Sequence, residues 1–528
     1  MSHILEKIQD LINNEQIKEA EDMAWLAFAQ NKKDIKILKT LGVTLLMQQK
    51  FKGALDIYHQ CLGLSNNDFD VLNNIAHLYL KIEEFESAEN YAQAAFQLKP
   101  EAHQPLITIT EINLRKRKFD VAYQNAIELQ KRLTFEMLTS NHQTMFLILD
   151  ALIAFNKNDE AMGLIHYCHN KKFIPEVFYY HTGVNTKSIT PDLIETANLF
   201  IKNSKFKNHI TKAKTLAPVY FGLGKYHLKD NQLLSDMNFI QGNSEIAGLQ
   251  RFRPLEIQKN LKQLKKVFNE DNYNPVFNDE EDGSNLIFVT GMPRSGTTLL
   301  ESIISSSGEV LSLGELTSIH DLFSHYADLE ENNSEEIDQR LFGDEEKGSR
   351  YLRRVNYLNK DEGKRYVLDK LPANYFYIGF IKKRFPKAKV FYIKRNPWDN
   401  AISLYQQFYV SQIPYSATFF NIAVAYANHE EVMRYWHEEL KLDFISINYE
   451  ELVSDPSIVA NKIFKYCNFE KPFDEKSRAG FFSRTASKHQ VRGDIHQKSI
   501  RKKAFEQQKL EFDEYLQSQR DYWKKSNI

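Results

Sequence analysis

Apolar and small residues in the first part of the chain recur at a fixed step of 34 residues. Phe51, Phe85 and Phe119 follow this step. A repeat of this length accommodates two antiparallel helices, and stacked repeats bury a continuous core. We therefore predict a helical array with regular repeats over residues 1–132. Three further series keep the same step: Ala20, Ala54, Ala88 and Ala122; Leu41, Ile75 and Ile109; and Leu46, Leu80 and Leu114.

The strict step ends near residue 132, but helical patterning continues beyond it. Residues 146–161 and 220–242 still have the spacing of helices, and we predict degenerate repeats over residues 133–268. Arrays of this kind usually offer a concave face to a partner, which for this chain we expect to be a protein or peptide. The acidic, Asn-rich residues 269–285 then predict a linker.

The pattern changes to short β-type runs after the linker. Residues 286–289, 390–394 and 444–449 are rich in β-branched or aromatic residues, and amphipathic segments separate them. This alternation predicts a parallel α/β sheet within residues 286–528, with helices on both faces. Ligands bind at the carboxyl ends of the strands in such sheets.

Composition excludes several other classes of protein. A chain of 528 residues is too long for one core, and 42% hydrophobic with 26% charged residues is ordinary for a globular protein. The net charge of −1 gives no sign of binding to nucleic acid or to an anionic membrane. Cys61, Cys168 and Cys467 lie too far apart in sequence for metal-ligand spacing, so we expect buried thiols and no metal. The charged N-terminus and the lack of a long apolar run predict a cytoplasmic protein without a membrane span.

The most informative stretch joins the first β-type run to a helix through a short loop. Gly291 and Gly296 bound this loop, and apolar residues at helical spacing follow over 297–306. The N–H groups of such a P-loop-like turn and of the helix N-terminus bind phosphate. Thr297 stands where nucleotide triphosphatases place the loop lysine, and the cation inside this loop is Arg294. This difference argues against hydrolysis of ATP or GTP.

Residues 293–298, Pro-Arg-Ser-Gly-Thr-Thr, resemble the 5′-phosphosulfate loop of sulfotransferases, which use 3′-phosphoadenosine 5′-phosphosulfate (PAPS) as the sulfuryl donor. The likeness covers about residues 284–503 in separate blocks. It is greatest to bacterial proteins that join tetratricopeptide repeats to a sulfotransferase domain, and to protein-tyrosine sulfotransferases. Leu41, Gly42 and Pro100 also match the tetratricopeptide pattern. The resemblance implies that the 5′-phosphosulfate end is bound by Arg294, Ser295, Gly296, Thr297 and Thr298, and that Arg294 stabilises the leaving phosphate.

Further blocks of the same resemblance imply the rest of the donor site and the catalytic groups. Ser403 follows Arg395 by eight residues, the spacing of the pair that binds the 3′-phosphate in the family. Gly-Glu at 314–315 matches the element that carries the catalytic base of tyrosine sulfotransferases, so Glu315 is the expected base. Lys370 would stabilise charge on the sulfuryl group, with Asn374 orienting the acceptor or the donor.

Three points stay open in this assignment. His320 or His325 is the alternative base, because other sulfotransferases use histidine and its ordinary pKa is better placed. Tyr449 matches a family element near the nucleotide, although a structural role is an equal alternative. By position, Ser487 and Lys502 would close over the adenosine and 3′-phosphate, where related bacterial chains carry Arg and then Trp instead of two lysines.

The sequence thus predicts helical repeats joined to a P-loop-like α/β sulfotransferase domain. The expected enzyme moves a sulfuryl group from PAPS to an acceptor hydroxyl, with a peptide tyrosine favoured by the resemblance and the repeats recruiting the acceptor. A carbohydrate or small phenol is the alternative acceptor. A non-catalytic repeat scaffold with a nucleotide-binding domain, or a nucleotide kinase with an unusual phosphate loop, is the alternative function.

Overall fold

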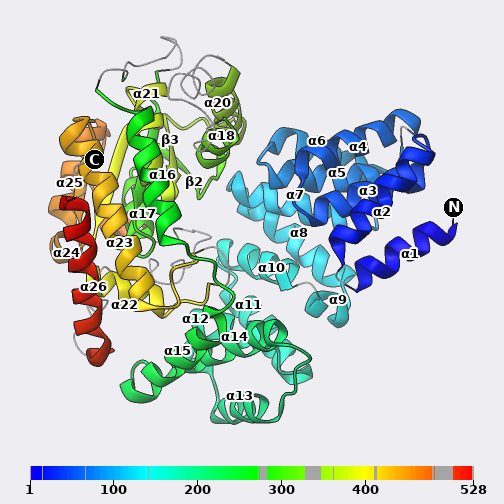
Figure 1. Ribbon diagram of the computed structural model, residues 1–528, viewed down its shortest axis with the longest axis horizontal. Coiled ribbons are helices and arrows are strands. Elements are labelled where there is room, and N and C mark those ends of the chain that lie inside the picture. Colours follow the sequence, from blue (N-terminus) through cyan, green and yellow to red (C-terminus); the bar gives the residue numbers. More distant parts are fainter. Residues whose placement is uncertain are drawn as a thin grey trace. The chain divides into compact units, whose positions relative to one another are not determined.

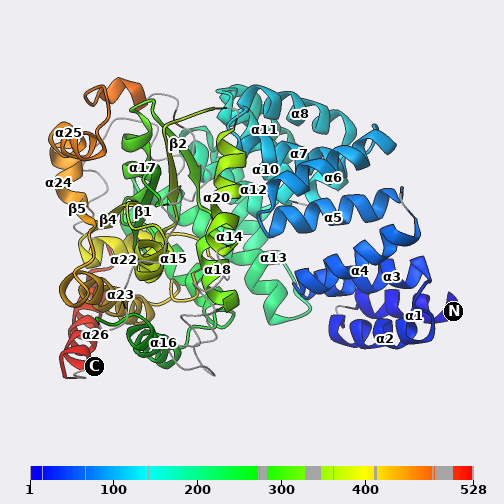
Figure 2. The same ribbon diagram turned by 90° about the horizontal axis from the view of Figure 1, so that it is seen from above.

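The computed structural model divides the chain into two compact units, whose elements Figures 1 and 2 show from two directions. One unit is Met1–Lys157 with Asn356–Asp361, and the other is Asn158–Val355 with Glu362–Ile528. The residues that the structure describes are 2–14, 16–65, 67–140, 142–270, 273, 282–326, 346–360, 362–409, 413–478, 481 and 504–525.

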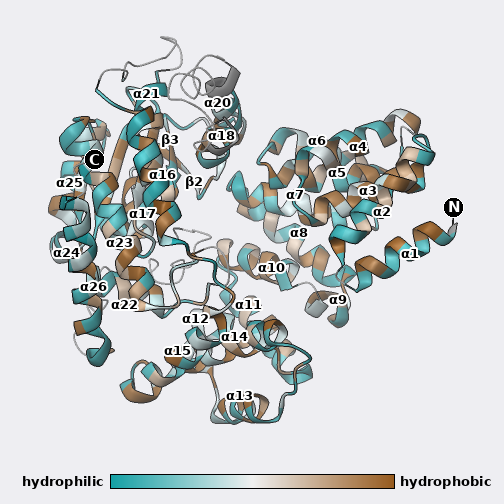
Figure 3. Ribbon diagram, in the orientation of Figure 1, coloured by the Kyte–Doolittle hydropathy of each residue, from teal (hydrophilic) through white to brown (hydrophobic). Residues whose placement is uncertain are grey.

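The described part of residues 1–157 is helical. In Figure 3 these helices carry both apolar and polar residues along their length, as amphipathic helices in a repeat array do. The elements are α1 (Ser2–Asn13), α2 (Ile17–Gln30), α3 (Ile35–Met47), α4 (Phe51–Leu64), α5 (Phe69–Lys81), α6 (Phe85–Leu98), α7 (Gln104–Arg115), α8 (Phe119–Arg132), α9 (Phe135–Ser140) and α10 (His142–Ala154).

The 34-residue step is the step from one helix pair to the next. Phe51, Phe85 and Phe119 each open the second helix of a pair, and the four alanines of the series are fully buried. Gly42 lies against the ring of Tyr58, where a Cβ would overlap it, so the paired helices approach closely. The predicted helical repeats are therefore confirmed. Two residues before the second helix of each pair, the backbone is left-handed, with φ near 60°. The residues in this conformation are Gln49, Glu83 and Arg117.

The second unit contains a parallel five-stranded sheet in the order β2-β3-β1-β4-β5. The predicted runs at 286–289, 390–394 and 444–449 correspond to three of its strands, so the parallel α/β prediction is confirmed. Two strands were not identified from the sequence. The five are β1 (Leu286–Gly291), β2 (Val310–Gly314), β3 (Tyr366–Lys370), β4 (Lys389–Lys394) and β5 (Ile445–Asn448).

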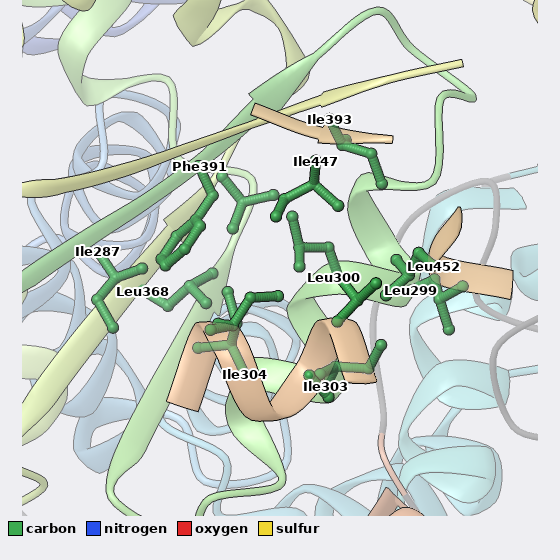
Figure 4. Close-up of a cluster of buried hydrophobic side chains, with 14 of the residues drawn as sticks. Ile287, Leu299, Leu300, Ile303, Ile304, Leu368, Phe391, Ile393, Ile447 and Leu452 are labelled. Carbon is green, nitrogen blue, oxygen red and sulfur yellow. The ribbon is translucent and has the colours of Figure 1, made fainter. Parts of the chain in front are cut away.

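One face of the sheet is covered by α17 (Thr297–Ser305), together with α24 (Tyr449–Ser454) and α25 (Pro456–Cys467). Leu300, Ile303 and Ile304 of α17 are fully buried. Figure 4 shows these side chains in one cluster with residues of the sheet, Ile304 lying beside Leu368. This contact fixes the helix that follows the glycine-bounded loop.

Helices that precede the sheet belong to the same unit and share a core with it. Ala217, Phe221, Phe239 and Ile246 lie in one cluster with Met292, which is part of the loop after β1. The helices predicted for residues 133–268 are present, and from residue 158 onward they pack within the unit of the sheet. They are α11 (Asn158–Lys171), α12 (Pro175–Val184), α13 (Pro191–Asn203), α14 (His209–His227), α15 (Gln232–Ala247) and α16 (Pro254–Val267).

The remaining elements belong to the second unit, except that the last four residues of α20, 356–359, belong to the first. Cys61, Cys168 and Cys467 are buried free thiols, as predicted. Among the described residues, no helix combines the length and the apolar character needed to cross a membrane. The elements are α18 (Ser318–Tyr326), α20 (Glu346–Asn359), α21 (Ile378–Arg384), α22 (Pro397–Tyr405), α23 (Phe419–Arg434), α26 (Glu506–Lys525), 3-10 turns at Thr186–Ser188, Pro372–Tyr377 and Glu475–Arg478, and a π-helical turn at Tyr435–Glu439.

Two glycines with positive φ lie at the two ends of α17, one in a crowded and one in an open environment. Gly296, which caps the helix, has φ of +109°, and a Cβ there would overlap the ring of Tyr449. Gly308, beyond the end of the helix, has φ of +79°, and a Cβ there would meet nothing within 4 Å. Gly296 is therefore required both by its backbone conformation and by a close approach.

The α17 contact predicts a stability effect. Ile303→Ala removes a fully buried side chain between helix and sheet, which should lower the free energy of unfolding by about 2–5 kcal/mol. Ile458→Ala is the matched control, because Ile458 is 57% exposed and should change stability by less than about 0.5 kcal/mol. Urea denaturation followed by circular dichroism measures both. Equal effects of the two substitutions would contradict the packing described for α17.

The two glycines provide a second test. Gly308→Ala should cost only the left-handed strain, about 1–2 kcal/mol. Gly296→Ala should cost about 1–3 kcal/mol more, because the new methyl group must displace Tyr449. The difference in urea midpoint at constant slope reports it. If the two variants unfold at the same midpoint, the close approach of Gly296 to Tyr449 has no energetic consequence.

Candidate functional site

The loop between β1 and α17 begins at the centre of the sheet. Gly291 pairs with Ile393 of β4, and a Cβ on Gly291 would overlap the carbonyl oxygen of Ile393. Arg294, inside the loop, is left-handed with φ of +69°. Such a conformation is strained for a residue with a side chain, and it persists only where its surroundings hold it in place.

Hydrogen bonds from side chains that follow β4 hold the loop in this conformation. The Asn400 amide on α22 donates a hydrogen bond to the Pro293 carbonyl (3.0 Å), and the Arg395 guanidinium donates one to the Arg294 carbonyl (3.0 Å). Arg294 Nε in turn donates to Ser403 Oγ (3.1 Å). The structure thus brings Arg294, Arg395 and Ser403 together, three residues that the sequence analysis selected from separate blocks.

The other loop residues line the start of α17. Ser295, Thr297 and Thr298 are buried, with at most 4% of their surface exposed. Among the described residues, Ser295 Oγ has no hydrogen-bond partner. A buried hydroxyl at a helix N-terminus, together with the N–H groups of the first helical turn, forms an arrangement that suits an anion.

Arg395 follows the carboxyl end of β4 and is 7% exposed. Its guanidinium carbon lies 4.6 Å from the centre of the Tyr449 ring, and the Tyr426 hydroxyl donates to its carbonyl (2.5 Å). Burial lowers the pKa of Arg395, an effect opposed by Tyr449, Asp399 and Glu450 and assisted by Arg294. Two arginines whose charges act on each other in a buried site favour binding of an anion there.

A second cluster lies at the carboxyl end of β3. Lys370 is fully buried, and its Nζ lies 2.6 Å from Glu315 Oε1 and 3.7 Å from Glu301 Oε2. Glu301, on α17, also accepts a hydrogen bond from Ser312 Oγ (2.5 Å) and is 1% exposed, whereas the Glu315 side chain is 41% exposed. Glu301 is therefore a fixed counter-ion, and Glu315 is the carboxylate of the pair that solvent and a substrate can reach.

The sheet places this cluster at the same edge as the loop. Lys370 pairs with Val289 of β1, and Thr290 Oγ1 donates to the Pro372 carbonyl (2.7 Å). Asn374, just beyond, is fully buried, and both atoms of its side-chain amide lack a hydrogen-bond partner among the described residues. An amide in this state normally has a further polar partner, so Asn374 is suited to bind part of a substrate.

The alternative bases are not in an equivalent position. His320 is exposed, and its Nδ1 lies 2.5 Å from the Tyr377 hydroxyl. The side chain of His325, and the residues Ser487 and Lys502, lie outside the described residues. In the part of the chain that is described, no group of three or more His, Cys, Asp or Glu residues is placed to hold a metal ion.

Sequence reasoning did not identify three residues that support the site: Glu301, Ser312 and Asn400. Glu301 interrupts the apolar run Leu-Leu-Glu-Ser-Ile-Ile of α17, and a charge on an otherwise buried helix face could have indicated a buried counter-ion. Asn400 lies between Arg395 and Ser403 and is fully buried. Nothing in the sequence distinguishes Ser312 from an ordinary strand serine.

Comparison with known proteins agrees with this geometry. Residues 286–475 match the model of the sulfotransferase family. An uncharacterized protein of Aquifex aeolicus strain VF5 is 32% identical over 233 residues, which is 41% of this chain but only 30% of that protein.

Two solved structures are each similar to a little under half of the chain. A sulfotransferase from Alicyclobacillus acidocaldarius is 16% identical, with a TM-score of 0.26, over 45% of this chain and 98% of that one. A tetratricopeptide repeat protein from Parabacteroides merdae is 17% identical, with a TM-score of 0.32, over 46% of this chain and 92% of that one. The stretch that matches the sulfotransferase family, residues 286–475, contains the loop after β1 and the Glu315–Lys370 pair.

Proposed function

We propose that the protein transfers a sulfuryl group from PAPS to an acceptor hydroxyl. The observation that carries this proposal is the junction of Arg294, Ser403 and Arg395, which joins the phosphate-type loop to α22 and to the residue after β4. A donor with phosphate groups at both its 5′ and 3′ ends needs two adjacent anion sites. The match of residues 286–475 to the sulfotransferase family supports the same assignment.

The described residues fit such a donor. Arg294, Ser295, Gly296, Thr297 and Thr298 would bind its 5′-phosphosulfate end, because Ser295 Oγ is buried without a partner among the described residues and Gly296 leaves room for close backbone approach. Beside them, Arg395 and Ser403 would bind the 3′-phosphate. Tyr449, which packs against both Gly296 and Arg395, would border the adenosine. We also assign Ser487 and Lys502 to the nucleotide, on the resemblance alone.

In the proposed reaction, Glu315 accepts the proton of the acceptor hydroxyl as its oxygen attacks sulfur. The new bond joins the acceptor oxygen to sulfur, and the bond between sulfur and the bridging oxygen breaks. Lys370 and Arg294 stabilise the negative charge that collects on that oxygen, and 3′-phosphoadenosine 5′-phosphate leaves. The side-chain exposure of 41% makes Glu315 accessible to the acceptor, while the buried Lys370 stays fixed by Glu301.

We further propose that residues 1–268 act as a repeat array that recruits a protein or peptide acceptor, with 269–285 as linker and 286–528 as the catalytic domain. A peptide tyrosine is the acceptor that the Gly-Glu element favours, and a carbohydrate or small phenol is the alternative. A non-catalytic scaffold would not need Glu315 and Lys370 in contact at the edge of the loop. Thr297 in place of a loop lysine disfavours a nucleotide kinase.

Nucleotide binding tests the donor site. Arg395→Ala should lower the preference for 3′-phosphoadenosine 5′-phosphate over adenosine 5′-phosphate by about 1.5–3 kcal/mol, because a charge-assisted contact to phosphate is lost. Ser403→Ala should lower it by less, although this change also releases Arg294 Nε. Lys394→Ala, which removes the exposed neighbouring cation, is the control. Calorimetry that finds the same preference in all three variants and in the wild type would place the 3′-phosphate elsewhere.

Turnover tests the catalytic assignment. Glu315→Gln keeps the size of the side chain and removes the proton acceptor, so transfer of labelled sulfate from PAPS should fall by about 10²–10⁴-fold. Binding of 3′-phosphoadenosine 5′-phosphate should barely change. An acceptor with a lower hydroxyl pKa should partly restore the rate, because it needs less help in losing its proton.

His320→Ala is the matched control and should keep nearly the wild-type rate, since the His320 ring is hydrogen-bonded to the Tyr377 hydroxyl. An inactive His320→Ala protein beside an active Glu315→Gln protein would make the histidine the base. Lys370→Ala is a less clean test, because it also leaves Glu301 buried without its counter-ion.

A further inference from the structure

The peptide group that joins Arg395 to Asn396 is held at both of its polar atoms. The Tyr426 hydroxyl on α23 donates to the Arg395 carbonyl (2.5 Å), and the Asn396 N–H donates to Glu450 Oε1 on α24 (2.9 Å). In a trans peptide the carbonyl and the N–H point in opposite directions, so the two bonds reach the group from opposite sides. Together they fix the plane of this peptide, and with it ψ of Arg395 and φ of Asn396.

This peptide lies between the end of a strand and the start of a helix. The ladder between β4 and β5 ends at the pair Lys394 and Asn448, and α22 begins at Pro397. The Asn396 side chain caps α22 by accepting hydrogen bonds from two N–H groups of the first helical turn (3.0 and 3.1 Å). The change of direction from strand to helix is therefore made at Arg395 and Asn396, the two residues whose shared peptide is held.

The two side chains that hold the peptide are themselves fixed. Asn448 caps α24 by accepting from the Glu450 N–H (2.9 Å), which sets the turn that carries the Glu450 side chain. Tyr426 is buried, and burial raises the pKa of its phenol, so the hydroxyl keeps its proton and stays a donor at neutral pH. One turn further along α23, Glu430 accepts two hydrogen bonds from Arg520 of α26 (2.7 Å each). Helix α26 therefore supports the helix on which Tyr426 lies.

The direction of the Arg395 side chain follows from this arrangement. The ladder fixes the chain before Arg395 and the held peptide fixes it afterwards, so the bond from Cα to Cβ has one direction. The guanidinium then donates to the Arg294 carbonyl (3.0 Å) and lies 4.6 Å from the centre of the Tyr449 ring. Tyr449 and Glu450 are neighbours on α24, and they hold the side chain and the main chain of the same arginine. A rotation of the peptide would be magnified at the end of this long side chain.

We propose that Tyr426 and Glu450 are positioning residues that set Arg395 for the 3′-phosphate and so determine the preference of the site for 3′-phosphorylated nucleotides. This inference rests on the proposed function and adds to it two residues that act through Arg395. A guanidinium binds phosphate strongly only when its planar fork is aligned with the oxygens. When the peptide is released, Arg395 loses that alignment, whereas Asn400 still holds the loop at Pro293.

The test compares binding of 3′-phosphoadenosine 5′-phosphate and adenosine 5′-phosphate to the full chain by calorimetry. Tyr426→Phe removes only the hydroxyl and should lower the preference for the 3′-phosphorylated nucleotide by roughly three- to tenfold, the usual range for one hydrogen bond. Affinity for adenosine 5′-phosphate should barely change, because that nucleotide has no group for Arg395 to bind. A general loss of structure would instead lower both affinities together and leave their ratio unchanged.

Two changes at Glu450 separate positioning from charge. Glu450→Ala removes the acceptor of the Asn396 N–H and should lower the preference in the same range. The charge of Glu450 acts on Arg395, and its loss would by itself tighten binding of an anion, so a decrease reports the lost hydrogen bond. Glu450→Gln keeps an oxygen for the Asn396 N–H and should retain at least the wild-type preference.

Tyr435→Phe is the matched control for Tyr426→Phe, because the Tyr435 hydroxyl is also buried and donates to backbone carbonyls, those of Lys265 and Phe268. It should keep the wild-type preference, as should Glu451→Ala, which changes the exposed neighbour of Glu450. An unchanged preference in Tyr426→Phe or in Glu450→Ala would overturn the role of that residue, and so would equal losses of affinity for the two nucleotides. A wild-type protein without any preference for the 3′-phosphorylated nucleotide would instead refute the donor site of the proposed function.

Discussion

The hydrogen-bonded ladder between β1 and β4 is the constraint on which the rest of the site depends. Parallel pairing brings the carboxyl ends of the two strands side by side, with Gly291 opposite Ile393. Gly291 must lack a side chain there, because a Cβ would overlap the carbonyl of its partner. From this point the chain leaves β1 into the loop and leaves β4 toward Arg395, so the guanidinium of Arg395 reaches the carbonyl of Arg294. A shift of one residue in this register would separate the two arginines.

The pairing of β1 with β3 places a group of carboxylates around Lys370 at the same edge of the sheet as the arginines of the loop. Around the loop, two buried arginines and the Ser295 hydroxyl, which has no partner among the described residues, favour an anion, while the Lys370 ammonium already lies beside two carboxylates. Burying one ammonium among these groups is tolerable because Glu301 and Ser312 complete its surroundings. The cluster therefore offers a carboxylate that solvent can reach, while the buried ammonium keeps its counter-ion, at the same edge of the sheet as the loop.

Local patterns in the sequence predicted much of this arrangement, and long-range packing accounts for what they missed. The loop was identifiable because its chemistry lies within six consecutive residues, 293–298, and the repeats because one step recurs in four series. β3 was missed because it ends in Asp369 and Lys370, and charged residues rarely indicate a buried strand. Glu301 resembled an ordinary helix glutamate until the sheet placed Lys370 beside it. The hydrogen bonds from Tyr179 to Gln407 and from Gln250 to Tyr409 join residues more than 150 positions apart in the sequence. No local pattern encodes such contacts.

The shared core of the second unit bears on how such a protein can be divided or recombined. Met292 of the loop and Trp398 of α22 lie in one apolar cluster with Phe221 and Phe239, which precede the sheet by many residues. A fragment that begins at the first strand would expose that face to water, and large exposed apolar patches promote association between copies. Domain exchange at that point would have to carry α14 and α15 along with the sheet. A viable exchange would therefore leave the boundary on the N-terminal side of α14, where this shared core is kept whole.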